Sequence, residues 1–426
     1  MFIFKATKSV AMKKPFWIIS FFALHSLFIS AQESNKDSIP KELFWYQKFK
    51  IGGYLQARYN DLYKTNPEME SPQGDRTYGG YHGFSLRRMR FKVSGQIHPR
   101  VYFYFQADFA SDGKNLGQLR DAYFDYSIDK AGTFKFRGGQ SKIPFGFENL
   151  QSSQNRIGLD RNDPLNSAVK DERDLSLGLH WATLKKRALF KELVSKGLKG
   201  SGDYGMAYLM LYNGQKANTL VPDVNKLKHI ALRFTYPVKL NSGQILEGGI
   251  SGYTGEYVTT EVNSGVKLRT EDGTVTDIEA LDQTFRDRRI AAHFIYYPQP
   301  FGFQAEYNLG KGPEYAYDSS NLTTPHSIGI ESLHGGYAQL MYMIRKKEHI
   351  ITPFARYMRY QGGKKFEIDA RSYDMQELEV GVEWQLNKAF EFTFNYTIAD
   401  RRYESSLNPV NRQKGQLIRM QFQVNY

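Results

Sequence analysis

Basic side chains at alternate positions of extended segments are the residues of this chain best suited to act on a ligand. Within 84–97, Arg or Lys occupies three alternate positions, and 133–142 repeats the pattern over two. Because successive strand residues point to opposite faces, each set shares one face at a spacing of about 6.6–7 Å. Such a row offers an anion successive weak sites, and the planar guanidinium of arginine can hold two phosphate oxygens. The predicted anion path consists of Arg88, Arg90, Lys92, Lys135, Arg137, Arg233 and Arg289.

More cations surround the long segment 143–171, whose stretch 149–166 is rich in Asn, Gln and Ser. Folded into a channel, this segment would narrow it and bring its cations together. Left outside, it would be an exposed loop with solvated charges. The predicted constriction residues are Lys142, Arg156, Arg161, Lys170 and Arg173.

Acidic residues leave a second interpretation open, in which the cations balance inward acids and the pore is general and weakly selective. Basic residues concentrate in the early segments and acidic residues in the late ones, which could instead produce a transverse field across such a pore. The acidic residues predicted to point inward are Asp108, Asp121, Asp125, Glu306, Glu377, Glu379, Glu383 and Glu391.

Catalytic chemistry has little support in the sequence. The chain lacks a Gly-x-Ser-x-Gly motif, a His-Glu-x-x-His motif and a Walker loop, and it contains no cysteine. His180, His229 and His293 lie on predicted strands without an adjacent serine of matching orientation. We therefore expect no enzymatic activity, no metal and no cofactor. The acidic stretch 271–282 keeps open a structural or adhesive barrel that acts through its loops.

A period of two residues along the chain predicts the elements that carry these side chains. The segment 389–399 alternates aromatic and aliphatic residues with Glu, Thr and Asn, and 416–426 shows a similar pattern. An inner face this polar would be costly in a dry sandwich core, but not in a water-filled barrel. We predict an all-β fold, a transmembrane antiparallel β-barrel of about 16 strands. The predicted strands are 49–60, 84–97, 100–110, 119–129, 133–142, 172–184, 202–213, 228–237, 244–254, 288–298, 301–311, 332–345, 348–361, 374–386, 389–399 and 416–426.

The gaps between these segments alternate between short and long. Short turns such as 98–99, 299–300 and 387–388 separate long loops such as 61–83 and 143–171. Bacterial outer-membrane barrels have this asymmetry, with short periplasmic turns and long extracellular loops. One gap departs from it: the Lys-rich segment 185–201 is long, and its pattern fits either a short periplasmic helix or extension of the neighbouring strands.

The N-terminus predicts export to the bacterial cell outer membrane. Lys13 and Lys14 precede an apolar run that ends at Ala31, as in a cleaved secretory signal peptide. We expect a signal peptide at 1–31, a polar periplasmic lead-in at 32–48 and the barrel at 49–426. The formal net charge is +13, which suits small phosphate-like anions as partners, and export argues against nucleic acid. The expected surroundings are outer-membrane lipid and lipopolysaccharide.

Two consecutive runs give the chain a resemblance to a known family. Residues 119–126 (LRDAYFDY) and 136–146 (FRGGQSKIPFG) are similar to the phosphate-selective porin O and P family, most clearly over 84–165. Ser152 and Ser153 also fit its loop. The resemblance implies a sixteen-stranded homotrimeric outer-membrane barrel with an inward-folded third loop and a lumen lined by Arg and Lys. The family commonly has Glu-Arg-Ser where this chain has Asp-Arg-Asn at 160–162, so only Arg161 is carried over, as a loop cation.

Overall fold

The computed structural model describes most of the chain from Trp45 onward. The predicted signal peptide, most of the lead-in and the constriction residue Lys170 lie outside the described residues. Those residues are 45–65, 83–110, 117–169, 173–215, 217–218, 224, 227–277, 284–317, 325–409 and 411–426.

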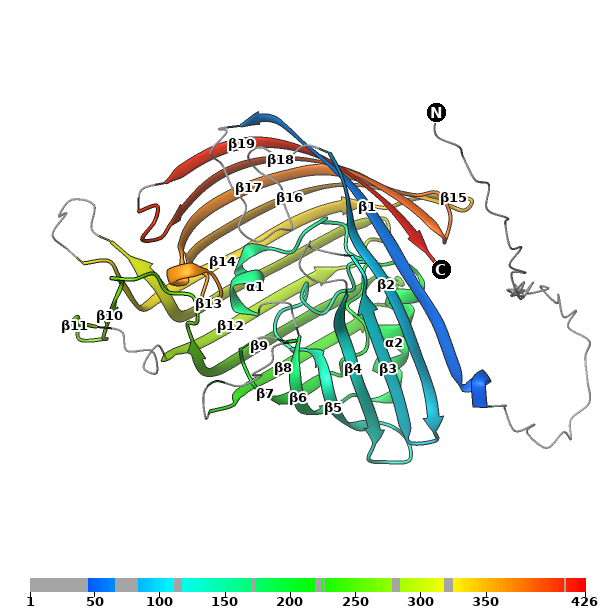
Figure 1. The fold of residues 1–426 in the computed structure, drawn as a ribbon. Coiled ribbons are helices and arrows are strands. Elements are labelled where there is room, and N and C mark those ends of the chain that lie inside the picture. Colours follow the sequence, from blue (N-terminus) through cyan, green and yellow to red (C-terminus); the bar gives the residue numbers. More distant parts are fainter. Residues whose placement is uncertain are drawn as a thin grey trace, which may run out of the picture. The chain divides into compact units, whose positions relative to one another are not determined.

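Sixteen long strands form one closed antiparallel β-barrel, because β1 pairs with both β2 and β19 (Figure 1). The long strands are β1 (Phe49–Thr65), β2 (Gly83–His98), β3 (Val101–Asp108), β4 (Gln118–Ser127), β5 (Phe134–Lys142), β6 (Arg173–Trp181), β7 (Ala207–Tyr212), β8 (His229–Lys239), β9 (Ile245–Val258), β12 (Thr284–Tyr296), β13 (Phe301–Ala316), β14 (Ser327–Tyr342), β16 (His349–Gly363), β17 (Ser372–Gln385), β18 (Phe390–Glu404) and β19 (Arg412–Asn425). Each corresponds to one predicted segment, so the predicted strand order and number are confirmed.

Shorter elements complete the described fold. The short strands are β10 (Lys267–Arg269), β11 (Val275–Asp277) and β15 (Ile344–Lys346), and β10 pairs with β14 in parallel over two residues. The helical elements are η1 (Trp45–Lys48), α1 (Asp163–Ala168), α2 (Leu184–Ser195) and η3 (Ile368–Ala370). No helix among the described residues is long and apolar enough to cross a membrane.

Strand alternation separates an apolar outer face from a polar inner face. On β8, Ile230, Leu232 and Phe234 are 43–50% exposed, whereas His229 and Arg233 on the other face are at most 1% exposed. On β18 the polar residues that alternate with the aromatic and aliphatic ones are likewise buried, namely Glu391, Thr393, Asn395 and Thr397. Exposed apolar side chains in a continuous belt fit contact with lipid, and the buried polar face fits a barrel interior.

A β-bulge in β2 changes the direction of one predicted side chain. Gln56 of β1 pairs with Arg88, but the next residue, Ala57, pairs with Leu86, so Arg87 is the extra residue. The alternation predicts that Arg87 lies on the outward face with Met89, as an exception whose side chain could reach to the rim, but a bulge places two successive residues on one face. Arg87 is half-buried and lies within electrostatic reach of Arg58 and Asp160 in the interior. The outward prediction for Arg87 is therefore wrong.

The Lys-rich gap 185–201 forms α2, so the helical alternative is the one the structure contains. Thr183 caps its N-terminus by accepting a hydrogen bond from the backbone N–H of Lys186. Its apolar side is buried in a cluster that also contains Phe147 of the long segment 143–169. The cluster residues on and just after α2 are Leu189, Phe190, Leu193 and Leu198. This packing explains why the gap does not shorten to a turn.

Candidate pore and its constriction

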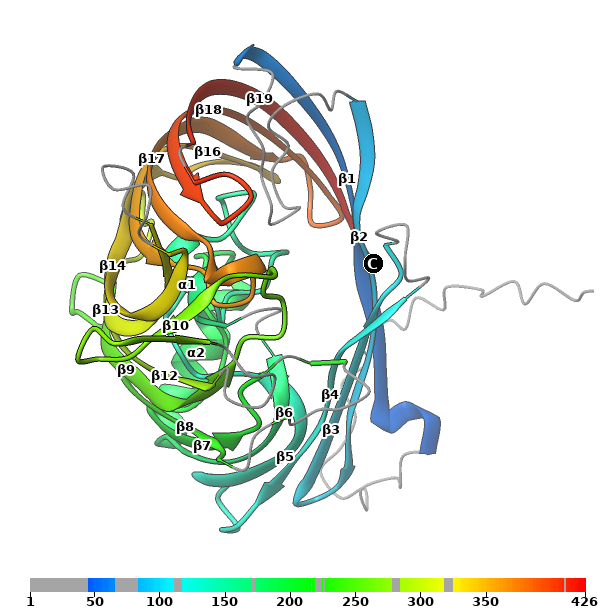
Figure 2. The same ribbon diagram turned by 60° about the vertical axis from the view of Figure 1, so that its left-hand side comes forward.

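The segment 143–169, here called the constriction loop, folds inside the ring of strands, as α1 shows in Figure 2. The backbone N–H groups of Phe147 and Glu148 donate to Glu306 of β13 at 2.7 and 3.1 Å. Gly146 N–H donates to the Ser251 hydroxyl of β9 at 2.9 Å. Because Phe147 and Glu148 are fully buried, this inward-folded arrangement is the one of the two predicted alternatives that the structure adopts.

The C-terminal part of the constriction loop is the short helix α1. The side chain of Asn162 accepts a hydrogen bond from the N–H of Leu165, and proline follows in the first turn, which is a favourable helix start. Asp163 pairs with Lys364 at 2.6 Å and with Arg401 of β18 at 3.1 Å. Ser167 accepts a hydrogen bond from Arg289 of β12 at 2.6 Å.

Two further carboxylates fix the loop to the late strands and β1. Asp160 pairs with Arg58 of β1 at 3.0 Å and with Arg419 of β19. Glu148 pairs with Arg356 of β16 at 3.0 Å. Arg419 continues the network to Glu379 of β17 at 2.8 Å. All these side chains are at most 1% exposed. Removing one member would leave a buried charge without its partner, which is strongly unfavourable, so the loop acids act as anchors.

The cations predicted for the constriction mainly hold the loop in shape. Lys142 donates to the carbonyl oxygens of Asn149, Leu150 and Gln151 at 2.7–3.1 Å. Arg156 donates to the carbonyl oxygens of residues 158 and 159 at 2.8 and 2.9 Å. Both side chains are buried, and so is Arg161.

Arg173 lies beside the loop at the start of β6 and pairs with Asp121 at 2.9 Å. Lys170 lies outside the described residues. A role for these five cations in contacting a permeating anion stays a prediction.

Most arginines of the predicted anion path are paired with the acidic residues of the same wall. The pairs are Arg90 with Asp108 at 2.8 Å, Arg137 with Asp125 at 2.7 Å, Arg233 with Glu247 at 3.4 Å and Arg289 with Asp287 at 2.9 Å. Arg88 donates to Gln56 at 2.9 Å. All five arginines are buried. Carboxylates of the same wall therefore neutralise most of these positive charges, as the charge-balance interpretation expects.

Three lysines on the inner face differ from these arginines. Lys92 and Lys135 are half-buried, and Lys50 of β1, which shares a face with Tyr54 and Gln56, is exposed. None of the three makes an ion pair with a described residue. Around them, Tyr104 and Tyr123 are also half-buried and stack at 5.2 Å. The inner faces of β1–β5 therefore keep solvated positive charge.

The opposite inner wall is covered. Arg233, Glu247, Gln304 and Thr352 on β8, β9, β13 and β16 are at most 2% exposed. The constriction loop packs against this side from within, and the cluster around Phe147 joins it to α2. On the side of β1–β5, the inner face keeps the more accessible Lys50, Lys92 and Lys135 beside buried residues such as Arg90.

Ion pairs within the late strands weaken the predicted contrast between basic early strands and acidic late strands. Glu377 pairs with Arg401 at 2.9 Å, Glu379 pairs with Arg419, and Glu383 pairs with Lys199 from the segment after α2. The late strands thus contain their own cations or receive one from the α2 segment. Alternation could have identified these residues, since Arg356, Arg401 and Arg419 all occupy inward positions.

In the loop after β16, the Lys365 side chain is buried against β12. Its ammonium pairs with Asp287 of β12 and lies 5.2 Å from the centre of the Tyr253 ring. Burial lowers the pKa of Lys365 to about 8, and the neighbouring Asp287 opposes this shift. Among the described residues, no group of three His, Cys, Asp or Glu side chains is placed to hold a metal ion.

A closed sixteen-stranded barrel with a loop folded into its interior defines the porin class of membrane channels. The sequence matches the family model "Phosphate-selective porin O and P" over residues 49–426, and the chain belongs to this family. The chain is therefore an outer-membrane porin.

Solved porin structures share the fold at low sequence identity. OmpT of Vibrio cholerae in its trimer form is 11% identical, with a TM-score of 0.51, covering 89% of this chain and 99% of that one. Salmonella typhi OmpF in complex with daunomycin is 10% identical, with a TM-score of 0.52 and coverage of 89% and 97%. An anion-selective porin from Comamonas acidovorans is 7% identical, with a TM-score of 0.51 and coverage of 89% and 99%. No curated protein sequence matches the chain.

Proposed function

We propose that this porin is a passive diffusion channel that prefers small anions, with phosphate as the candidate substrate. The observation that carries the proposal is the set of three solvated lysines, Lys50, Lys92 and Lys135, on the inner faces of β1, β2 and β5. An unpaired ammonium in contact with water attracts anions and repels cations along the whole path that passes it. No chemical step is needed, because the ammonium donors only replace part of the hydration of the anion.

The buried arginines add little to this anion preference. Each guanidinium that is already paired with a carboxylate contributes little net field, so Arg90, Arg137, Arg233 and Arg289 act mainly as structural members of the wall. We expect a moderate anion preference from lysines that attract anions without trapping them. The family description supports phosphate as the anion to test first, and the Comamonas neighbour is itself described as anion-selective.

The same proposal includes the surroundings of the channel. We propose cleavage of the leader after Ala31, a periplasmic lead-in at 32–48 and a barrel domain at 49–426. We also propose a homotrimer, for which the trimer form of the Vibrio cholerae neighbour is the supporting observation. Its outer wall would contact outer-membrane lipid and lipopolysaccharide through the exposed apolar belt.

Phosphate is tested by current block in a planar bilayer. The purified protein is inserted at 0.1 M KCl, and inorganic phosphate is added at constant ionic strength while single-channel chloride current is recorded. A saturable decrease in chloride current supports a phosphate site. A current that changes only in proportion to the ion mobilities contradicts phosphate preference and leaves a general anion channel.

A further inference from the structure

The end of the barrel that carries the short turns has a basic surface that the channel function does not use. Its cations come from α2 and the segment just after it, from the end of β8, and from the hairpin that joins β15 to β16. The members, here called the basic patch, are Lys191, Lys196, Lys239, Arg345, Lys346 and Lys347. All six are exposed. Lys196 and Lys239 remain 59% and 45% exposed although both contact Glu192. Glu348 is the exposed acid next to them.

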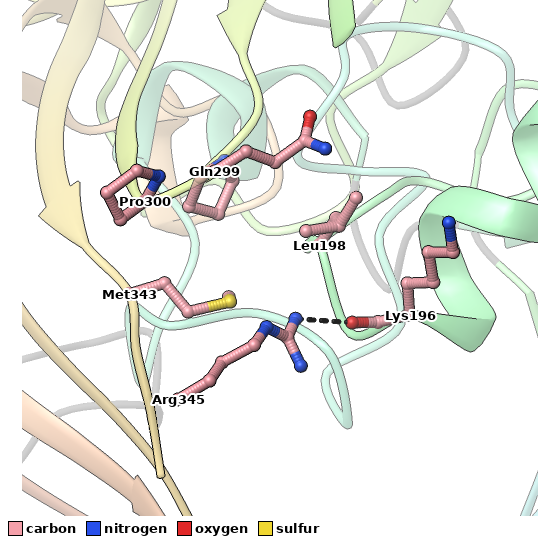
Figure 3. Close-up of a pocket in the computed structure, with 7 residues that line it drawn as sticks. Lys196, Leu198, Gln299, Pro300, Met343 and Arg345 are labelled. Atoms are coloured by element: carbon pink, nitrogen blue, oxygen red, sulfur yellow. Dashed lines mark hydrogen bonds between the residues drawn. The ribbon is translucent and has the colours of Figure 1, made fainter. Parts of the chain in front are cut away.

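A pocket with an apolar floor opens within the basic patch. Its volume is about 570 Å³, and Leu198, Met343, Pro298 and Pro300 contribute to its lining. Lys196 and Arg345 line its cationic side, where the Arg345 guanidinium donates to the carbonyl oxygen of Lys196 at 2.6 Å (Figure 3). The hydrogen bond joins the end of α2 to the β14–β16 connection, so the pocket is held between two elements.

The chemistry of the pocket specifies one kind of occupant. The apolar floor has room for a large apolar side chain together with part of the segment that carries it, and the surrounding cations favour carboxylates on either side. Met343 and Arg345 lie on the inward side of the strand ends, while the exposed Tyr342 and Ile344 lie on the outward, lipid-facing side. The pocket therefore faces the periplasmic mouth and not the bilayer, which disfavours a lipid headgroup.

We propose that the basic patch is a docking site for an acidic segment of a periplasmic protein, with one aromatic or large aliphatic residue of that segment in the pocket. The site has a direct connection to the channel interior. Leu198 and Met343 belong to the same buried cluster as Phe147, at the base of the constriction loop. A bound segment would thus rest on side chains that also support the loop.

A defined peptide tests the proposal on the full-length porin in nanodiscs of zwitterionic lipid. The probe is a fluorescein-labelled ten-residue peptide of Asp and Glu with one central Phe, and fluorescence anisotropy measures its affinity. The patch variant is Lys346→Glu/Lys347→Glu, on the exposed hairpin away from the packed cluster. The control variant is Lys130→Glu/Lys388→Glu, which makes the same charge change on exposed turns elsewhere at this end. We expect about tenfold weaker binding for the patch variant and a much smaller change for the control.

A second comparison isolates the pocket. Replacing the central Phe of the peptide with Ser should weaken binding to the unmodified porin by a similar factor, since the pocket loses its apolar occupant. No measurable binding of the Phe peptide overturns the proposal. Equal losses in patch and control variants also overturn it, because binding would then be general attraction to a basic surface. Binding of the porin to vesicles of anionic phospholipid through the basic patch, without binding of the peptide, would also overturn the proposal. The occupant of the patch would then be a membrane surface.

Discussion

Neutralising the three solvated lysines should reduce anion preference without unfolding the barrel. In the variant Lys50→Gln/Lys92→Gln/Lys135→Gln, no described ion pair is broken, because none of the three lysines makes one. At 0.1 M salt, a unit charge about 10 Å from a permeating ion contributes about 0.15 kcal/mol after screening. This energy favours the anion and disfavours the cation, so each lysine changes their permeability ratio by about 0.3 kcal/mol.

Three lysines together give about 0.9 kcal/mol, which corresponds to about a fivefold drop in the chloride-to-potassium permeability ratio. The assay is the reversal potential across a KCl gradient in a planar bilayer. The matched control is Arg286→Gln/Arg288→Gln/Lys311→Gln, which removes three exposed charges from the outward face of β12 and β13. An unchanged ratio in the lysine variant, or an equal drop in the control, would refute the assignment of the anion path to these lysines.

Three other perturbations follow from the structure. Arg90→Gln leaves Asp108 without its partner at 2.8 Å and should destabilise the barrel by about 3 kcal/mol. Thermal unfolding in detergent measures this loss, and the double variant Arg90→Gln/Asp108→Asn should recover part of it. An unchanged unfolding temperature in Arg90→Gln would mean that the pair is dispensable. Asp160→Asn weakens the attachment of the constriction loop to Arg58 and Arg419, so single-channel conductance and current noise should rise, whereas the exposed change Asp277→Asn should alter neither. Burial holds the pKa of Lys365 at about 8 in the folded protein, against 10.5 for the ordinary side chain. The folded state therefore binds fewer protons than the unfolded state between these values, and the free energy of unfolding should rise with pH in that window. Lys365→Met should flatten this part of the stability profile, and a profile identical to that of the unmodified protein would contradict the shift.

The strand pattern was predictable from the sequence because lipid and water enforce a strict alternation on a barrel wall. All sixteen segments appear in the structure, including β19, whose alternation between residues such as Met420 and Gln421 is regular. Departures from the alternation occur at β-bulges, as at Arg87 in β2 and at Arg120 in β4. A bulge depends on how two strands register against each other, and β2 alone contains no signal for the extra residue.

The site was less predictable than the fold, because side-chain pairing between distant strands is not encoded in local spacing. The sequence identifies Arg90 and Asp108 as inward residues, but not that they neutralise each other. The acids of the constriction loop, Asp160 and Glu148, were not predicted as anchors, because their partners Arg419 and Arg356 lie 259 and 208 residues away. Lys50 was missed because only Lys48 shares its alternation on one side, and the face continues with Gly52 and Tyr54 on the other.

The most direct test of the proposed function is the zero-current potential of the unmodified porin in a planar bilayer with a tenfold KCl gradient at neutral pH. We predict a potential whose sign corresponds to faster chloride than potassium permeation. A potential near zero would mean that the paired charges of the wall offset one another completely and that the channel is a general porin. A potential of the opposite sign would contradict the anion path along β1–β5.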